Sequence, residues 1–281
     1  MGIFEAILLG IVQGLTEFLP ISSTAHLTIA GQWLGLIDPQ HPEHWTAFIA
    51  VIQLGTLLAV LVYFFRDVLE ITAAFIGENL VSRTRIRYQS TQARLGWFVI
   101  VGSVPIAVIG LVFKKAIEGH LTKSLTLIAT SLIVMGLLLG LAEITGRFRK
   151  DIRKMSVPDA LLIGCAQAFA LIPGSSRSGT TITAGLFLGM TRESAARFSF
   201  LLSMPAVFAS GLLEFKESLG FMGSQDLLVL FVATLASAIS GYATIEFLLK
   251  FLRTHTTFAF VSYRIALGAF LLIFGKYFNL L

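Results

Sequence analysis

Long apolar runs without charge alternate along the chain with shorter polar segments. Five runs hold no Asp, Glu, Lys or Arg, and they cover residues 45–65, 95–113, 124–142, 198–213 and 227–245. A sixth run, 256–275, is apolar apart from Arg264. Because about 20 apolar residues in a helix cross the hydrocarbon core of a bilayer, this pattern predicts about six transmembrane helices.

Two further segments, 5–35 and 159–189, are too polar for ordinary spans. Pro20 interrupts the first near its middle, and Pro173-Gly174 interrupts the second. Each arm of roughly 15 helical residues would reach about 22 Å, which is short of the ~30 Å hydrocarbon core. A helical hairpin that enters and leaves the membrane by the same face fits these lengths, so we predict two re-entrant hairpins.

The two polar segments are copies of one another. A shift of 154 residues aligns 5–35 with 159–189 without a gap, and nine positions are identical, including Gln13/Gln167 and Ser22/Ser176. Three apolar runs follow each copy, and an odd number of crossings inverts the second copy in the membrane. Inverted repeats of this kind meet near the bilayer midplane.

These patterns define one predicted fold. It is an all-α polytopic membrane protein, a single membrane domain over 1–281, with about six transmembrane helices plus two re-entrant helical hairpins in an inverted-topology repeat. The halves cover about 1–145 and 155–281.

Composition agrees with a membrane protein and limits the kinds of partner that the protein is expected to bind. The 281 residues are 56% hydrophobic and 13% charged, whereas soluble domains carry about 25% charged residues. The net charge of +5 comes from loops, so the lipid bilayer and not a nucleic acid is the expected partner. The single cysteine, Cys165, excludes an internal disulfide.

Loop charges predict the orientation. Two connections, 66–94 and 143–158, are rich in Arg and Lys, whereas 37–44 has neither and 214–226 has Lys216 alone. By the positive-inside rule the two basic connections are cytoplasmic. The first hairpin then opens outward and the second inward. The loop 114–123 holds three lysines on the outer side and weakens this assignment.

The first hairpin carries five candidate polar side chains. Gln13 and Glu17 are four residues apart, so they share one helix face. Beyond the break, Ser22 and Ser23 precede His26 by four and three residues. A hydroxyl within reach of an imidazole can become a nucleophile, and ionisable groups at membrane depth are usually functional. We therefore expect a reactive Ser–His pair beside a carboxylate.

The second hairpin reads as an anion cradle around Arg177. Glycine lets backbone N–H groups converge on an oxyanion, and a helix that starts here adds its positive end. The guanidinium of Arg177 matches phosphate oxygens in a planar fork. The expected phosphate contacts besides Arg177 are Gly174, Ser175, Ser176, Ser178 and Thr181.

The two motifs QGLTEFLPISSTAH and PGSSRSGTT resemble those of the bacterial undecaprenyl-pyrophosphate phosphatase family, also called the bacitracin-resistance protein family. The resemblance extends over essentially the whole chain. It implies an enzyme of the bacterial cytoplasmic membrane that hydrolyses undecaprenyl pyrophosphate, recycles the lipid carrier for cell-wall synthesis and confers bacitracin resistance. It also implies a divalent cation, Mg²⁺ or Ca²⁺, and an active site that faces the periplasm.

The resemblance assigns roles to individual residues. Glu17 and His26 match the essential acidic residue and histidine, and Ser23, with Ser22 beside it, matches the nucleophile. Ser176, Arg177 and Thr181 match phosphate-contacting positions. Gln13 stands where many members have glutamate. An amide brings no charge to a metal, so Glu17 and the substrate's own phosphates would have to hold the cation, and Gln13 is the further candidate ligand.

Three questions stay open at this point. A transporter or flippase of a phosphorylated polyprenyl lipid fits an inverted repeat with midplane hairpins equally well, although transport needs no Ser–His pair. Water could attack the phosphorus in place of Ser23. A homodimer is one assembly that the sequence leaves open.

Arg264, inside the last run, needs a partner, and Glu246 or a backbone carbonyl is expected to supply it.

Overall fold

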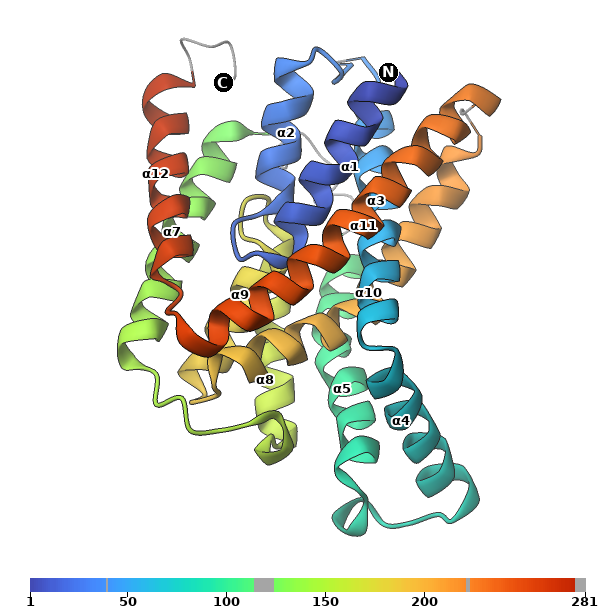
Figure 1. Ribbon diagram of the computed structural model, residues 1–281, viewed down its shortest axis with the longest axis vertical. Helices are drawn as coiled ribbons and strands as arrows, with labels where there is room; N and C mark the ends of the chain where they lie inside the picture. The colour runs from blue at the N-terminus through green and yellow to red at the C-terminus, as the bar shows by residue number, and fades with distance from the viewer. Residues whose placement is uncertain (39, 114–123, 221–222, 276–281) are drawn as a thin grey trace.

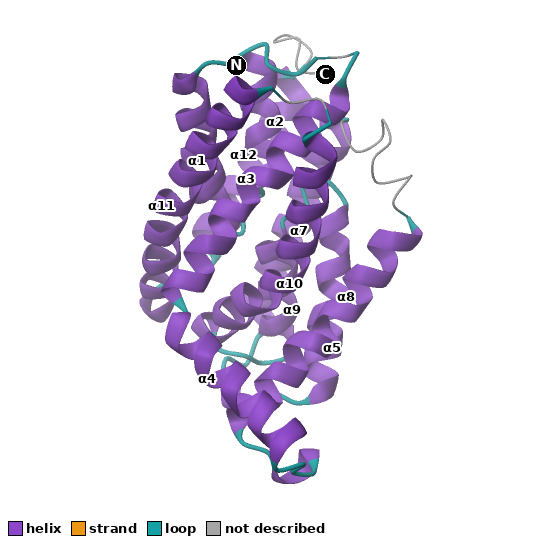
Figure 2. Ribbon diagram, turned by 90° about the vertical axis from the view of Figure 1, so that its right-hand side faces the viewer, coloured by secondary structure: helices purple, strands orange, loops and turns teal. Residues whose placement is uncertain are grey.

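A computed structural model describes residues 1–275 apart from 39, 114–123 and 221–222. Within these ranges every regular element is a helix, as Figure 2 shows. Five helices are long and apolar enough to cross a membrane. They are α3 (Pro42–Tyr63), α5 (Thr91–Val112), α7 (Leu125–Thr145), α10 (Arg192–Ser218) and α11 (Ser224–Thr254). Each covers one of the five uncharged runs to within two residues at its ends, so these spans are confirmed as apolar helices.

The sixth predicted span forms a shorter helix. α12 (Phe258–Phe274) has 17 residues, which corresponds to about 26 Å. It packs lengthwise against α7, as the left side of Figure 1 shows.

One segment that the sequence presents as a loop is largely helical. The basic connection 66–94 contains α4 (Phe65–Ile76), η1 (Gly77–Val81) and η2 (Ile86–Tyr88). Phe75 of α4 packs edge-to-face on Trp97 of α5, with ring centroids 5.1 Å apart. Charges at Arg66, Asp67 and Glu70 conceal the one-sided apolar pattern of α4 in the sequence. The lysine-bearing segment 114–123 lies outside the described residues.

The outward faces of the long helices are apolar. On α5, Val104, Val108 and Leu111 are 51%, 53% and 77% exposed. Such contiguous exposed apolar faces are unusual on soluble proteins. Lipid contact accounts for them, and together with the long apolar helices they support a membrane protein.

Each predicted hairpin is a pair of helices around a break. The first consists of α1 (Ile3–Phe18) and α2 (Ser23–Trp33). The second consists of α8 (Val157–Ala168), the short η5 (Phe169–Leu171) and α9 (Arg177–Phe187). In Figure 1, α1 and α2 lie at the end that holds the N-terminus, and α8 begins near the opposite end.

The hairpins share unusual backbone details at the 154-residue offset. Ser22 and Ser176 have φ values of 77° and 69°, and each caps the following helix through its side chain. Gly35 and Gly189, with φ values of 65° and 81°, end the second helix of each hairpin. Positive φ is rare for serine and costs free energy. Its recurrence at matching positions shows that both copies build the same tip.

The first helix of each hairpin crosses a long helix of the other half closely. A Cβ atom at Gly10 of α1 would overlap the Ala233 carbonyl of α11, and one at Gly164 of α8 would overlap Gly102 of α5. Small residues permit such crossings inside membranes.

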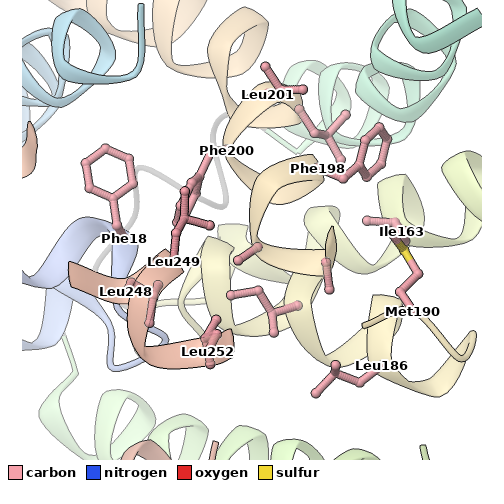
Figure 3. Close-up of a cluster of buried hydrophobic side chains, with 14 of the residues drawn as sticks. Phe18, Ile163, Leu186, Met190, Phe198, Phe200, Leu201, Leu248, Leu249 and Leu252 are labelled. Atoms are coloured by element: carbon pink, nitrogen blue, oxygen red, sulfur yellow. The ribbon is translucent and has the colours of Figure 1, made fainter. Parts of the chain in front are cut away.

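The largest buried apolar cluster of the described residues includes Phe18, the last residue of α1, and Phe200 of α10. Their rings meet edge-to-face with centroids 5.1 Å apart, and Figure 3 shows the side chains around them.

Candidate functional site

The tips of the two hairpins are in direct contact. Ser178, in the first turn of α9, donates from Oγ to the carbonyl oxygens of Glu17 (3.2 Å) and Leu19 (3.0 Å). Beside it, Arg177 forms an ion pair with the Glu17 carboxylate. The site residues predicted in separate halves of the sequence therefore lie together inside the helical bundle.

Glu17 is the centre of this cluster. Glu17 is 7% exposed, and three side chains donate hydrogen bonds to its carboxylate. Gln13 Nε2 and Ser23 Oγ each lie 2.8 Å from Oε2, and Arg177 Nη2 contacts Oε1. A buried carboxylate requires such compensation. Gln13 and Glu17 share a helix face, as their spacing predicts.

The hydroxyl of Ser23 and the imidazole of His26 do not pair as the sequence suggests. Ser23 donates to Glu17 instead. The ring nitrogens of His26 lie 2.7 Å (Nδ1) from the Ser22 carbonyl oxygen and 2.6 Å (Nε2) from the Tyr263 hydroxyl. The physical reason is that the imidazole points back to the preceding turn and toward α12, whereas Ser23 at the helix start faces α1. The group that can accept the Ser23 proton in this geometry is Glu17.

Most hydroxyl groups of the second tip form hydrogen bonds with other groups of the protein. Ser176 Oγ accepts from the Gly179 amide (3.2 Å) and lies 3.1 Å from Ser178 Oγ. Thr181, 1% exposed, donates to the Arg177 carbonyl (2.8 Å) and lies 2.6 Å from Ser199 Oγ. These contacts shape the turn from which α9 starts. A phosphate contact by Ser176, Ser178 or Thr181 stays a prediction.

Arg177 is the side chain of the second tip best placed to meet an anion. It lies at the first position of α9, where the helix presents its positive end. Its side chain is 16% exposed, and a guanidinium has five N–H donors. The contact with Glu17 therefore leaves further donors for the oxygens of a phosphate.

Arg264 fastens the two tips to one another. It is fully buried and donates to the carbonyl oxygen of Pro20 in the first tip and to those of Gly174 and Ser175 in the second, each at 3.0 Å. A further bond of 3.2 Å reaches Leu132 of α7. Of the two partners expected from the sequence, the backbone carbonyls are the ones observed. The sequence does hold one sign that Arg264 belongs to a functional site, because it is a charged residue in an otherwise apolar span.

Tyr263 was not identified from the sequence. Its ring stacks on that of His26 with centroids 5.6 Å apart and planes inclined by 8°. The only local signal is its position beside Arg264 in α12, and a tyrosine in a span more often lies at the membrane interface.

Two residues of the first tip, Gln13 and Glu17, bear on the predicted divalent cation. Gln13 is fully buried, and its Oε1 atom has no hydrogen-bond partner among the described residues. It lies on the same helix face as the Glu17 carboxylate. Within the described ranges no group of three or more His, Cys, Asp and Glu side chains could hold a metal. These two residues offer oxygen atoms of the kind that hard cations prefer, and a cation here would take most of its ligands from phosphate oxygens; its binding stays a prediction.

These features define a class of protein. The chain is a polytopic helical membrane protein in which two hairpins join a serine hydroxyl, a buried carboxylate, an imidazole and an arginine at a helix N-terminus. This arrangement suits transfer or binding of a phosphoryl group inside the membrane.

The chain belongs to the family described as "Bacitracin resistance protein BacA", whose profile matches residues 6–270. Curated relatives agree along nearly the full length. It is 66% identical to the undecaprenyl-diphosphatase of Syntrophobacter fumaroxidans over 272 residues, covering 97% of both chains. It is 53% identical to that of Chloroherpeton thalassium, over 97% of this chain and 96% of the relative. Identity to that of Prosthecochloris aestuarii is 50%, over 95% of each chain.

Proposed function

We propose that this protein is an integral membrane phosphatase that hydrolyses undecaprenyl pyrophosphate to undecaprenyl phosphate and inorganic phosphate. In this role it recycles the lipid carrier of cell-wall synthesis and confers bacitracin resistance. The family and the names of its relatives support the substrate. The observation that carries the chemistry is the hydrogen bond of Ser23 Oγ to the buried Glu17 carboxylate, which also contacts Arg177 across the two tips.

These contacts support the following reaction. Ser23 Oγ attacks the terminal phosphorus, its proton passes to Glu17, and the bond between that phosphorus and the bridging oxygen breaks. Undecaprenyl phosphate leaves and takes up the proton from Glu17. Water then attacks the phosphoserine phosphorus, the bond from phosphorus to Ser23 Oγ breaks, one proton of the water restores the serine hydroxyl, and inorganic phosphate leaves. Arg177 and the N-terminal end of α9 stabilise the charge on the transferring group, which is the main demand in phosphoryl transfer. His26, on the same helix as Ser23, is a second proton carrier.

A divalent cation, Mg²⁺ or Ca²⁺, belongs to this proposal. Glu17 and Gln13 Oε1 would hold it together with phosphate oxygens, and it would supply neutralisation of the pyrophosphate charge.

The proposed orientation places the protein in the bacterial cytoplasmic membrane with the first hairpin open to the periplasm. The basic connections α4–α5 and α7–α8 lie at the end opposite the N-terminus, which supports a cytoplasmic location for them. The matched tips and the crossings at Gly10 and Gly164 support an inverted repeat with about six spans and two re-entrant hairpins.

Phosphate release by the purified protein tests the function. With undecaprenyl pyrophosphate in detergent, we expect inorganic phosphate to appear, to cease when a chelator is added, and to resume when Mg²⁺ or Ca²⁺ is restored. Hairpins that enter from opposite ends also occur in transporters. An absence of phosphate under every metal condition would therefore favour transport of the phosphorylated lipid.

Arg177→Lys is expected to lower kcat/KM at least about tenfold, or about 1.4 kcal/mol of transition-state stabilisation. Lysine keeps the charge but loses the planar fork that matches phosphate oxygens. Steady-state phosphate release measures the effect. Arg253→Lys is the matched control, since Arg253 pairs with Glu193 on the surface, and it should retain full activity. Equal kcat/KM in Arg177→Lys and wild type would reduce Arg177 to a structural charge.

A further inference from the structure

The hydrogen bonds of His26 define which of its nitrogens carries the hydrogen. Nδ1 lies 2.7 Å from the carbonyl oxygen of Ser22, and a carbonyl oxygen only accepts hydrogen bonds. Nδ1 is therefore the N–H donor. In the neutral imidazole Nε2 is then the acceptor, and the Tyr263 hydroxyl 2.6 Å away donates to it.

Tyr263 is well placed to hold this arrangement. Its ring is nearly parallel to the imidazole, at 8°, so stacking and the hydrogen bond fix the same orientation. The neighbouring Arg264 binds carbonyl oxygens of both hairpin tips. This anchors the turn of α12 that bears Tyr263 against the hairpin that bears His26.

A phenolic hydroxyl can serve both protonation states of the imidazole. It donates to Nε2 when His26 is neutral, and after a half-turn of its O–H it accepts from Nε2–H when His26 is charged. Phenylalanine can do neither. Without the hydroxyl, Nε2 would lose its partner, and the bond from Nδ1–H to the Ser22 carbonyl would be the one described hydrogen bond left to orient the ring.

We propose that Tyr263 is a positioning residue for the phosphatase reaction: together with the Ser22 carbonyl on Nδ1–H it fixes the orientation of the His26 imidazole, and it partners Nε2 whenever a proton arrives or leaves there. The inference rests on the proposed function, and it adds a residue of the last helix, outside both hairpins, to the machinery.

Tyr263→Phe tests the proposal, because it removes one oxygen and keeps the ring that stacks on His26. We expect kcat to fall about tenfold or more while KM changes less than about twofold, since a positioning group acts on the proton-transfer step and not on lipid binding. Tyr242→Phe is the matched control. Tyr242 packs against Tyr63, with centroids 5.4 Å apart, and its replacement should leave kcat unchanged.

A spectroscopic measurement separates positioning from loss of structure. In protein labelled with ¹⁵N-histidine, the His26 signals are those that disappear in His26→Asn. The wild type should show a hydrogen-bearing Nδ1 and an acceptor Nε2. Tyr263→Phe should keep the hydrogen on Nδ1, because the Ser22 carbonyl still accepts it, while its Nε2 signal should move to that of an acceptor without a hydrogen bond. Its melting temperature should equal that of Tyr242→Phe.

The outcomes are distinguishable. A wild-type protein that releases no phosphate would defeat the proposed function itself. An active wild type together with unchanged kcat and an unchanged His26 Nε2 signal in Tyr263→Phe would overturn the role of Tyr263 alone. Loss of kcat with a lowered melting temperature and an unchanged Nε2 signal would reduce Tyr263 to packing.

Discussion

Ser23→Ala is expected to reduce phosphate release from undecaprenyl pyrophosphate by more than about a thousandfold, the scale seen when a nucleophile is removed from an enzyme that forms a covalent intermediate. Ser23 Oγ donates to the Glu17 carboxylate 2.8 Å away, so the hydroxyl already has a proton acceptor in place. Alanine removes the attacking oxygen and leaves the remaining contacts of Glu17 with Gln13 and Arg177. The measurement is single-turnover and steady-state phosphate release.

The matched control for this variant is Ser103→Ala. Ser103 Oγ donates to the Val99 carbonyl within its own helix, at 2.7 Å, and its loss should change activity little. Ser23→Ala should also keep the wild-type melting temperature, because the serine hydroxyl adds little packing. Retention of a large part of the activity would eliminate the phosphoserine step and assign the attack to water.

Gly174→Ala should disable the second tip and lower the melting temperature. Gly174 has φ +87°, and a Cβ atom there would overlap the carbonyl oxygen of Ile128. The left-handed conformation costs about 1–2 kcal/mol for a non-glycine residue, and overpacking adds about 1–3 kcal/mol. Displacement of the turn would also shift Arg177 away from Glu17, so we expect phosphate release to fall by at least about a hundredfold.

Gly35→Ala separates the conformational cost of positive φ from the cost of overpacking. Gly35 also has positive φ, 65°, but a Cβ atom there meets nothing within 4 Å among the described residues. It should show the conformational cost alone, with activity close to wild type in thermal-melting and phosphate-release assays. Equal behaviour of the two variants would mean that the close approach to Ile128 does not hold the turn.

Much of the fold could be predicted because the bilayer imposes it. A span must be apolar and must satisfy its own backbone hydrogen bonds, so the uncharged runs correspond to long helices. The repeat was also visible, since both tips need the same serine cap and the same terminal glycine. α4 was missed because its charged residues hide an apolar side that packs on α5.

The sequence predicted which residues form the candidate site, but it did not predict which of them contact one another. Spacing along one helix correctly joined Gln13 to Glu17. Spacing could not reveal that Ser23 would face Glu17 or that His26 would face Tyr263. Those contacts depend on where α1 and α12 lie relative to α2, and one sequence carries no information on such distances. Arg177 could be proposed as an anion ligand, yet its ion pair with Glu17 joins residues 160 positions apart.

The buried guanidinium of Arg264 limits how this molecule can move. Its charge is compensated by carbonyl oxygens from both hairpins and from α7. A transport cycle that swung one hairpin away from the other would strip the cation of ligands on one side, at a cost of several kcal/mol for an uncompensated buried ion. The tips therefore behave as one clamped unit. We therefore expect a lipid substrate to reach the tips by lateral diffusion in the bilayer, and turnover to proceed without rocking of the two halves past each other.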